Sequence, residues 1–273
     1  MSNDKAMVHA FQSLGGDLHS VTALQVFHPL GDMTLEEFMK HKGENPYKKQ
    51  RKYAKFVNFG FIFGKIAHSF AKQDLEPNWT KEEAEQFVKD NHLTIRQGED
   101  AYLASAIYIR DKFFKTYSAL MPWMDTLHKV GRRDGVIYSS FGARRLVPEL
   151  TYVGQDSDKK IISNLDNICV NSPVQNHEST IINRSMRRAT DMFEHGCEEN
   201  DFTPMETHIN GMTHDAVNWT VADEDNPWVY KKLHEIFETD YSENNHVPIS
   251  YEIDEAHPDD PVNPTPWAFG EVV

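Results

Sequence analysis

The sequence has little of what marks membrane, secreted or disulfide-bonded proteins. No stretch approaches the roughly 20 consecutive apolar residues of a membrane-spanning helix, and residues 1–5 lack the apolar core of a signal peptide. Only two cysteines occur, Cys169 and Cys197, and neither belongs to a CxxC pair or another metal-binding spacing. We therefore expect a cytoplasmic protein without a membrane partner, in which both cysteines are small packed side chains.

Basic residues are also scarce. The chain has 28 Lys and Arg against 42 Asp and Glu, a formal net charge of −14, which by itself argues against a nucleic-acid partner. The charge is unevenly distributed, however. Residues 42–65 carry seven basic side chains against Glu44 alone, whereas residues 219–273 carry thirteen acidic and two basic ones. A basic strip and an acidic region can face different partners on one fold, so the net charge excludes neither class.

Helical signals dominate the first half of the chain, and strand signals join them after residue 135. Thr34 and Thr80 each precede a glutamate by three residues, the capping-box pattern of a helix start. Apolar residues recur at helical spacing over residues 99–120, 123–130 and 177–195. Residues 136–138 and 145–148, and the two halves of 209–221, flank turns and predict paired strands. We therefore expect an α+β chain, with the polar segments 72–98 and 223–262 at its periphery.

The densest functional signal lies between residues 50 and 64. Arg51, Lys55, Phe59 and Phe63 recur every four residues, so on a helix they form one stripe about 18 Å long at roughly 1.5 Å per residue. Two cations followed by an aromatic ring would suit a nucleoside triphosphate, with the cations on the phosphates and the ring against the base or sugar. The alternative is a basic amphipathic helix whose aromatic face is packed in the interior.

The pattern Arg51-x-x-x-Lys55-x-x-Asn58-Phe59-Gly60-x-x-Phe63-Gly64 closely resembles motif B of the family A DNA polymerases, which include bacterial DNA polymerase I and its phage relatives. Four further segments resemble that family in the same order, over roughly residues 8–220. They are Gly16-Asp17-Leu18-His19, residues 135–150 around Phe141-Gly142, Asn171-Ser172-Pro173-Val174-Gln175, and His214-Asp215, which resembles motif C.

The resemblance implies an α+β fold made of a helical fingers subdomain and part of the antiparallel-sheet palm of a right-hand polymerase. Residues 1–134 would form the fingers, with the motif B helix at about 49–65 and an insertion at about 72–98. Residues 135–273 would form the palm part, with the motif C hairpin at about 207–222 and an acidic C-terminal region.

The resemblance also implies a nucleotide site. In the family, the Arg and Lys of motif B bind the incoming triphosphate, which gives that role to Arg51 and Lys55, assisted by His19. Phe59 stands where relatives carry Phe or Tyr, a position that governs discrimination against dideoxynucleotides. Phe63 replaces the usual Tyr on the template side and keeps the ring without its hydroxyl. Without the other segments, His19 reads as a surface or helix-cap histidine.

Contacts to the primer–template duplex are implied in the second half. Asn171 and Gln175 match the N-x-P-x-Q residues that meet minor-groove acceptors shared by all base pairs. The other residues expected to contact DNA are Arg144, Arg145 and His214. The alternative for Asn171 and Gln175 is ordinary turn and helix-start chemistry around Pro173. Asn167 stands where relatives often carry Arg, which implies one lost contact.

Asp215 is implied to be the metal-binding and catalytic aspartate, alongside Arg51 and Lys55. Polymerases transfer nucleotides with two metal ions about 3.5–4 Å apart, and carboxylate oxygens suit Mg²⁺. An isolated Asp in a turn is otherwise usually structural. The family commonly continues His-Asp-Glu, and Ala216 replaces that Glu here.

The second metal-binding aspartate of the family belongs to motif A, upstream of the segment that matches Gly16-Asp17-Leu18-His19. Nothing around Asp4 resembles that motif. We therefore expect the C-terminal subunit of a naturally divided DNA polymerase, a phage-type enzyme of an infected bacterial cytoplasm. Its partners would be primer–template DNA, dNTPs and a second polypeptide with motif A, the thumb and possible proofreading exonuclease. An initial Met and a polar leader favour a separate gene.

Three other interpretations compete with this one. A non-catalytic DNA- or nucleotide-binding accessory protein, decayed from a polymerase, is favoured by Ala216, Phe63 and Asn167 and opposed by the intact Arg51 and Lys55. A histidine metal protein is prompted by 14 histidines, but no HxxxH or HExxH spacing occurs. A fragment of a longer polymerase would share every motif.

Overall fold

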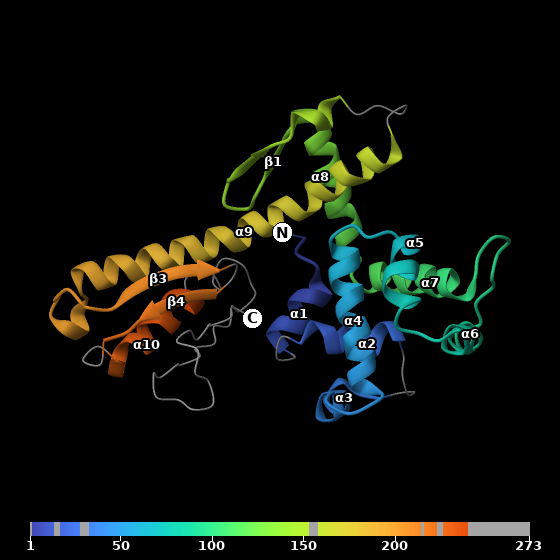
Figure 1. The fold of residues 1–273 in the computed structure, drawn as a ribbon, viewed down its shortest axis with the longest axis horizontal. Helices are drawn as coiled ribbons and strands as arrows, with labels where there is room; N and C mark the ends of the chain where they lie inside the picture. Colours follow the sequence, from blue (N-terminus) through green and yellow to red (C-terminus); the bar gives the residue numbers. More distant parts are fainter. Residues whose placement is uncertain are drawn as a thin grey trace. The chain divides into compact units, whose positions relative to one another are not determined.

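The computed structural model describes residues 2–13, 17–27, 33–152, 158–213, 216–222 and 226–239. The chain divides into two compact units, Met1–Tyr138 with Arg144–Pro173 and Ser139–Ala143 with Val174–Val273. The long helix α9 (Lys159–His195) contributes to both (Figure 1). The predicted domain boundary between residues 134 and 135 stays a prediction.

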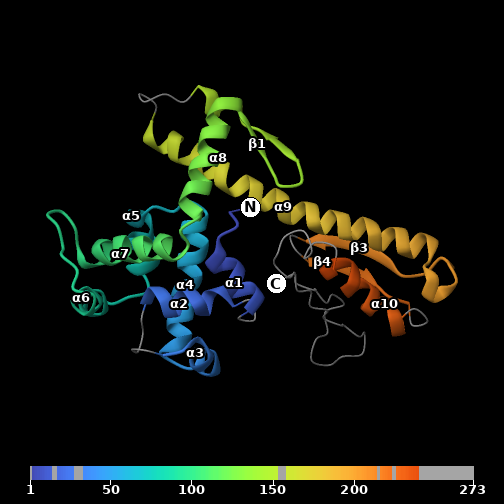
Figure 2. The same cartoon turned by 180° about the vertical axis from the view of Figure 1, so that it is seen from behind.

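The first unit is predominantly helical, as Figure 2 also shows from behind. Its helices are α1 (Lys5–Ser13), α2 (Leu18–Phe27), α3 (Leu35–His41), α4 (Tyr47–Ile62), α5 (Ala67–Phe70), the π-helix η1 (Ala71–Leu75), α6 (Lys81–Asp90), α7 (Ala101–Thr116), α8 (Leu120–Asp134) and the 3-10 helix η2 (Pro148–Thr151). Strands β1 (Val136–Tyr138) and β2 (Arg144–Leu146) pair antiparallel, which confirms the predicted hairpin.

Both predicted capping boxes are present. The hydroxyl of Thr34 accepts from the backbone N–H of Glu37, and that of Thr80 accepts from Glu83, while each glutamate accepts from the backbone N–H of its threonine. These bonds satisfy donors that the first helical turn leaves free, so α3 and α6 begin where the sequence predicts.

Helix α4 packs one face into the main core and leaves the other exposed. Val57 and Phe61 are fully buried, and the Phe61 ring lies 4.9 Å from that of Phe70 and 5.7 Å from that of Phe113. The helix packs against α2 and α7. The buried face of α4 comprises Tyr53, Ala54, Val57, Asn58, Gly60 and Phe61, whereas Lys52, Lys55 and Phe59 are exposed.

The segment 72–98 is not peripheral throughout, contrary to the expectation from its polar composition. Leu75, Trp79, Ala84 and Val88 belong to the same core as Phe61. Each pair is spaced by four, so a narrow apolar stripe is buried although most of the surrounding residues are polar. This part of the chain therefore helps to hold α4 in place.

Helix α9 begins at Lys159, well before the start predicted near residue 177, and it runs through Pro173. Proline removes one backbone hydrogen bond from a helix. Here Leu165 and Cys169, one turn apart, are buried against Ile137 and Leu150 in a small core, which stabilises the preceding turns. The alternative interpretation of Asn171 and Gln175, a turn and helix start around Pro173, is therefore wrong.

The second unit places a β-hairpin and short helices on the C-terminal part of α9. Strands β3 (His208–Thr213) and β4 (Ala216–Thr220) pair antiparallel with an irregularity between Ile209 and Gly211. The remaining elements are the 3-10 helix η3 (Glu198–Asn200), α10 (Asn226–His234) and the π-helix η4 (Glu235–Thr239).

The core of this unit joins α9, the hairpin and the terminal helices. The Trp219 ring packs edge-on against Phe193 and Phe237, with ring centroids 5.6 and 6.0 Å apart. Two hairpins within a mainly helical chain confirm the predicted α+β class. Cys169 is fully buried, as expected, whereas Cys197 is half-buried. Across the described ranges, no helix combines the length and apolarity needed to cross a bilayer.

Candidate functional site

Arg51, Lys55 and Phe59 lie on the outward face of α4. Phe59 is 50% exposed, Lys55 is exposed and the Arg51 side chain is 37% exposed. The Lys55 ammonium lies 5.9 Å from the centroid of the Phe59 ring. Two aromatic residues of this helix therefore lie in different places, Phe61 in the core and Phe59 at the surface.

Phe63 caps the C-terminal end of α4 and continues the stripe in a half-buried position. Its ring is nearly parallel to that of Phe59, with an interplanar angle of 14° and centroids 6.3 Å apart. Gly64 follows with φ +83, and a Cβ atom there would collide with the Asn167 side chain. Glycine thus permits both the backbone turn after α4 and the close approach of Asn167.

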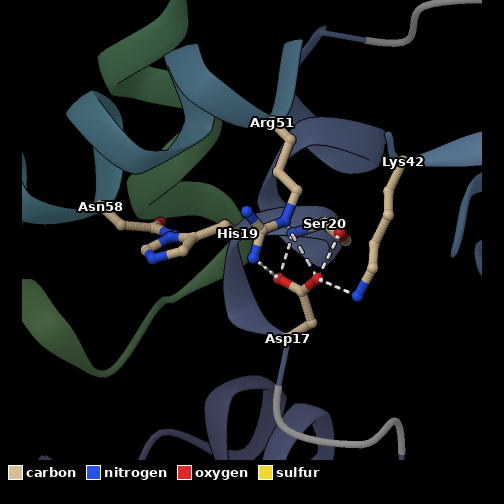
Figure 3. Close-up of polar contacts among 6 residues, drawn as sticks. All are labelled: Asp17, His19, Ser20, Lys42, Arg51 and Asn58. Carbon is tan, nitrogen blue, oxygen red and sulfur yellow. Dashed lines mark hydrogen bonds and ion pairs between the residues drawn. The ribbon is translucent and has the colours of Figure 1, made fainter. Parts of the chain in front are cut away.

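Asp17, immediately before α2, pairs with Arg51 (Figure 3). Its carboxylate accepts from Arg51 Nε at 3.0 Å and from Arg51 Nη2 at 3.2 Å. It also accepts from the Ser20 hydroxyl at 2.7 Å and the Ser20 backbone N–H at 3.1 Å, and Lys42 Nζ lies 3.6 Å away. Burial raises the pKa of Asp17, but the hydrogen bonds from Arg51 and Ser20 prevail and hold it below its ordinary value.

His19 is the second residue of α2 and lies beside the stripe. Its ring centroid is 5.6 Å from that of Phe59, and its Nδ1 is 2.8 Å from Asn58 Nδ2 (Figure 3). The amide nitrogen is a donor, so Nδ1 accepts and the neutral ring carries its hydrogen on Nε2. Burial, and then the positive charges of Arg51 and Lys55, lower the pKa of His19 below its ordinary value.

Asn58 is fixed from its other side by a buried network. Its carbonyl accepts from the Thr22 hydroxyl at 2.8 Å, and that hydroxyl lies 2.8 Å from the Tyr117 hydroxyl. Burial raises the pKa of Tyr117 to about 12, so the phenol stays protonated. The three residues come from α2, α4 and the end of α7, and they connect the site to the core.

Two contributors to this site have no assigned role in the sequence interpretation, although both stand in its quoted motifs. Asp17 precedes the histidine by two residues at a helix start, where an acidic side chain is common. Asn58 is a polar residue on the buried face of an otherwise apolar helix stripe, and it is only 2% exposed. A buried amide requires hydrogen-bond partners, and that requirement is the signal that points to it.

The residues expected to contact DNA are distributed over β2, the middle of α9 and the second hairpin. Arg145 Nη1 donates to the Ser172 hydroxyl at 3.1 Å, and Arg144 is exposed. Asn171 is half-buried and its Oδ1 has no hydrogen-bond partner among the described residues, whereas Gln175 is exposed. The Oδ1 atom of Asn171 is itself buried, so this unpaired acceptor is not accessible to a ligand in this structure.

His214 and Asp215 lie outside the described residues, between β3 and β4 in the sequence. The flanking residues Thr213 and Ala216 are paired across the hairpin. Within the described part of the chain, no three His, Cys, Asp or Glu side chains are grouped so as to hold a metal ion. The assignment of Mg²⁺ to Asp215 stays a prediction.

Comparisons with known proteins identify the family of this chain. A family model described as DNA polymerase family A matches residues 1–258. The thermostable DNA polymerase I of Thermus thermophilus is 25% identical over 188 residues, which cover 69% of this chain and 18% of that protein. DNA polymerase I of Bacillus subtilis (strain 168) is 26% identical over 186 residues, 68% of this chain and 16% of that protein.

A solved structure shares the fold. The POL domain of Pol1 from M. smegmatis, in complex with DNA primer-template and dNTP, superimposes with a TM-score of 0.63 at 17% identity, over 90% of this chain and 35% of that one. The matched part of the chain spans less than a fifth of the length of the two curated relatives.

Proposed function

The chain belongs to DNA polymerase family A, and from this premise we propose that it supplies the fingers and part of the palm of a template-directed DNA polymerase. The observation that carries the proposal is the exposed row of Arg51, Lys55 and Phe59 beside His19. Two cations, an accessible ring and a donor on Nε2 offer separate partners to the phosphates and the base or sugar of one nucleotide.

In this proposal Arg51 and Lys55 bind the triphosphate of the incoming dNTP. His19, kept neutral and oriented by Asn58, donates a hydrogen bond from Nε2 to a phosphate oxygen. Phe59 packs against the nucleotide, and Phe63, parallel to it, extends the aromatic surface toward the template. These are nucleotide-binding roles, and they require no movement of the buried face of α4.

The same proposal assigns the primer–template duplex to the second half of the chain. Asn171 and Gln175 would read minor-groove acceptors shared by all base pairs. The basic and imidazole side chains assigned to the DNA backbone are Arg144, Arg145 and His214. Asp215 would hold Mg²⁺, which supplies charge stabilisation for nucleotidyl transfer when bound.

A second metal-binding carboxylate is required, and we propose that another polypeptide carrying motif A and the thumb provides it. Asp4 does not qualify, because it is 3% exposed and its carboxylate is already committed. It accepts from the backbone N–H groups of Ala6, Met7 and Ala119 at 3.0, 3.2 and 2.8 Å. The same proposal includes the phage source and an infected bacterial cytoplasm as the location.

Primer extension tests the proposal. The purified chain is assayed with primer–template, dNTPs and Mg²⁺, alone and after mixing with the polypeptide that carries motif A. Extension only in the mixture supports a divided polymerase, and robust extension by the chain alone contradicts it. Nucleotide binding without incorporation in the mixture would instead support the accessory-protein alternative.

A further inference from the structure

The guanidinium of Arg51 is already occupied by an anion from its own chain. Asp17 accepts from two of its nitrogen atoms, and the Asp17 side chain is only 9% exposed. On the proposed function, which this inference deepens, the same guanidinium must bind a phosphate. In this structure, therefore, the side chain proposed to bind the nucleotide phosphates, Arg51, is bound to Asp17 instead.

Carboxylate and phosphate compete for the same donors. The planar fork of an Arg side chain binds either group through two parallel N–H bonds. With Nε and Nη2 directed at Asp17, a phosphate cannot receive that pair of bonds until the ion pair opens. Lys55 differs, because it forms no ion pair with any described residue, and it is available to a phosphate from the outset.

The surroundings of Asp17 allow Arg51 to leave. A buried carboxylate without partners would be strongly unfavourable. After loss of Arg51, Asp17 would retain the Ser20 hydroxyl and backbone N–H, and Lys42, at 3.6 Å, stands ready to approach the same oxygen. Figure 3 shows Lys42 reaching Asp17 from the opposite side to Arg51. Lys42 can therefore replace Arg51 as the partner of Asp17, and the Asp17 carboxylate is not left without a positive charge beside it.

We propose that Asp17 is an internal competitor of the nucleotide: it holds Arg51 when the site is empty, yields it to the triphosphate, and recaptures it when pyrophosphate leaves. Asp17 acts through Arg51 and touches no ligand itself. Its presence weakens the binding of both phosphate ligands, and it lets pyrophosphate dissociate faster than two unopposed cations would allow.

The test is a double-mutant cycle on the full chain, with dTTP and inorganic pyrophosphate as probes in calorimetric titrations. Asp17→Asn keeps the shape of the side chain and removes its charge, so both probes should bind about tenfold more tightly. In an Arg51→Gln background the same change should have almost no effect, because there is no guanidinium to release. Glu36→Gln is the control, since Glu36 is 82% exposed and, among the described residues, pairs with Lys40 one turn away; it should change neither affinity by more than about twofold.

Each other outcome has a definite meaning. Weaker or unchanged binding in Asp17→Asn, with Arg51→Gln alone clearly weaker than the native chain, overturns the competitor and leaves the nucleotide site intact. Equal binding by the native chain and Arg51→Gln removes the proposed nucleotide role of Arg51 itself.

A second measurement applies if Asp17→Asn does not fold. The Arg51 Nε–H resonance of the native chain, assigned by its absence in Arg51→Gln, and the Asp17 carboxyl resonance should both shift when pyrophosphate is added. A carboxyl resonance that stays unchanged at saturation would mean that the ion pair persists, and the competitor would be rejected.

Discussion

The amide nitrogen of Asn58 lies 2.8 Å from Nδ1 of His19, and this single contact determines which ring nitrogen of the imidazole can donate a hydrogen bond. Since Asn58 also accepts from Thr22, the orientation of its amide is fixed from both ends. The chemistry offered at the surface by His19 is thus determined by a side chain in the interior of α4. The same arrangement makes the site sensitive to changes that never touch a ligand.

Replacing Asn58 with Ala should lower the free energy of unfolding by about 2 kcal/mol, because His19 and Thr22 each lose a buried partner. Urea denaturation of the full chain measures this. The matched control is Asn183→Ala, which removes an exposed helical amide that bonds to Ser179 and should change the free energy by less than about 0.5 kcal/mol. Equal effects of the two substitutions would contradict the assigned network.

His19 should titrate below its ordinary pKa of 6.5 in the folded chain. Burial contributes first, and the charges of Arg51 and Lys55 add to it, so Lys55→Gln should move the NMR titration midpoint of His19 upward. The unfolded chain then binds a proton more readily than the folded chain, and this contribution to stability is present above pH 6.5 and lost as the pH falls below it. A midpoint above 6.5 in the native chain would disprove the assigned environment.

Phe61 and Phe59 provide a matched pair on one helix. Phe61→Ala removes a fully buried ring in contact with two others, so it should reduce the free energy of unfolding by about 3–5 kcal/mol. Phe59→Ala should change stability by less than about 1 kcal/mol, because the ring is half-exposed. It should instead weaken dTTP binding about tenfold, if stacking against the nucleotide contributes about 1–1.5 kcal/mol. Binding unaffected by Phe59→Ala would exclude the ring from the nucleotide site.

Asp215→Ala, tested in the presence of the motif A polypeptide, should abolish primer extension while leaving binding of primer–template within about threefold of the native value. The reason is that a metal-binding carboxylate serves the chemical step, whereas the duplex is bound by other residues. Gel-shift and extension assays on the same preparation separate these effects. Retained extension would remove Asp215 from the metal site.

Helical periodicity predicted that Arg51, Lys55 and Phe59 share one face of a helix. Periodicity left open whether the aromatic part of that face is packed in the interior, and the structure shows the Phe59 ring half-exposed. The ion pair between Asp17 and Arg51 joins residues 34 positions apart on different elements, and it depends on how α2 packs against α4, which no local pattern reports.

The sequence also did not predict that α9 continues through Pro173. A proline and neighbouring polar residues predict a break, and only the packing of Leu165 and Cys169 against distant residues shows that the helix persists. The buried stripe in residues 72–98 has the same origin. In both segments local composition favours the surface, and tertiary burial prevails.

The hydrogen-bonded chain from Thr22 through Asn58, with Tyr117 beside it, has a mechanical consequence for α4. One residue of helix corresponds to a rotation of about 100°, so an insertion or deletion between Lys55 and Asn58 would turn both cations away from the ring while the amide stayed anchored. The buried hydrogen bonds of Asn58 thereby fix where the exposed residues of α4 lie around the helix. Insertions and deletions in this part of α4 should be tolerated far less than substitutions at its exposed positions.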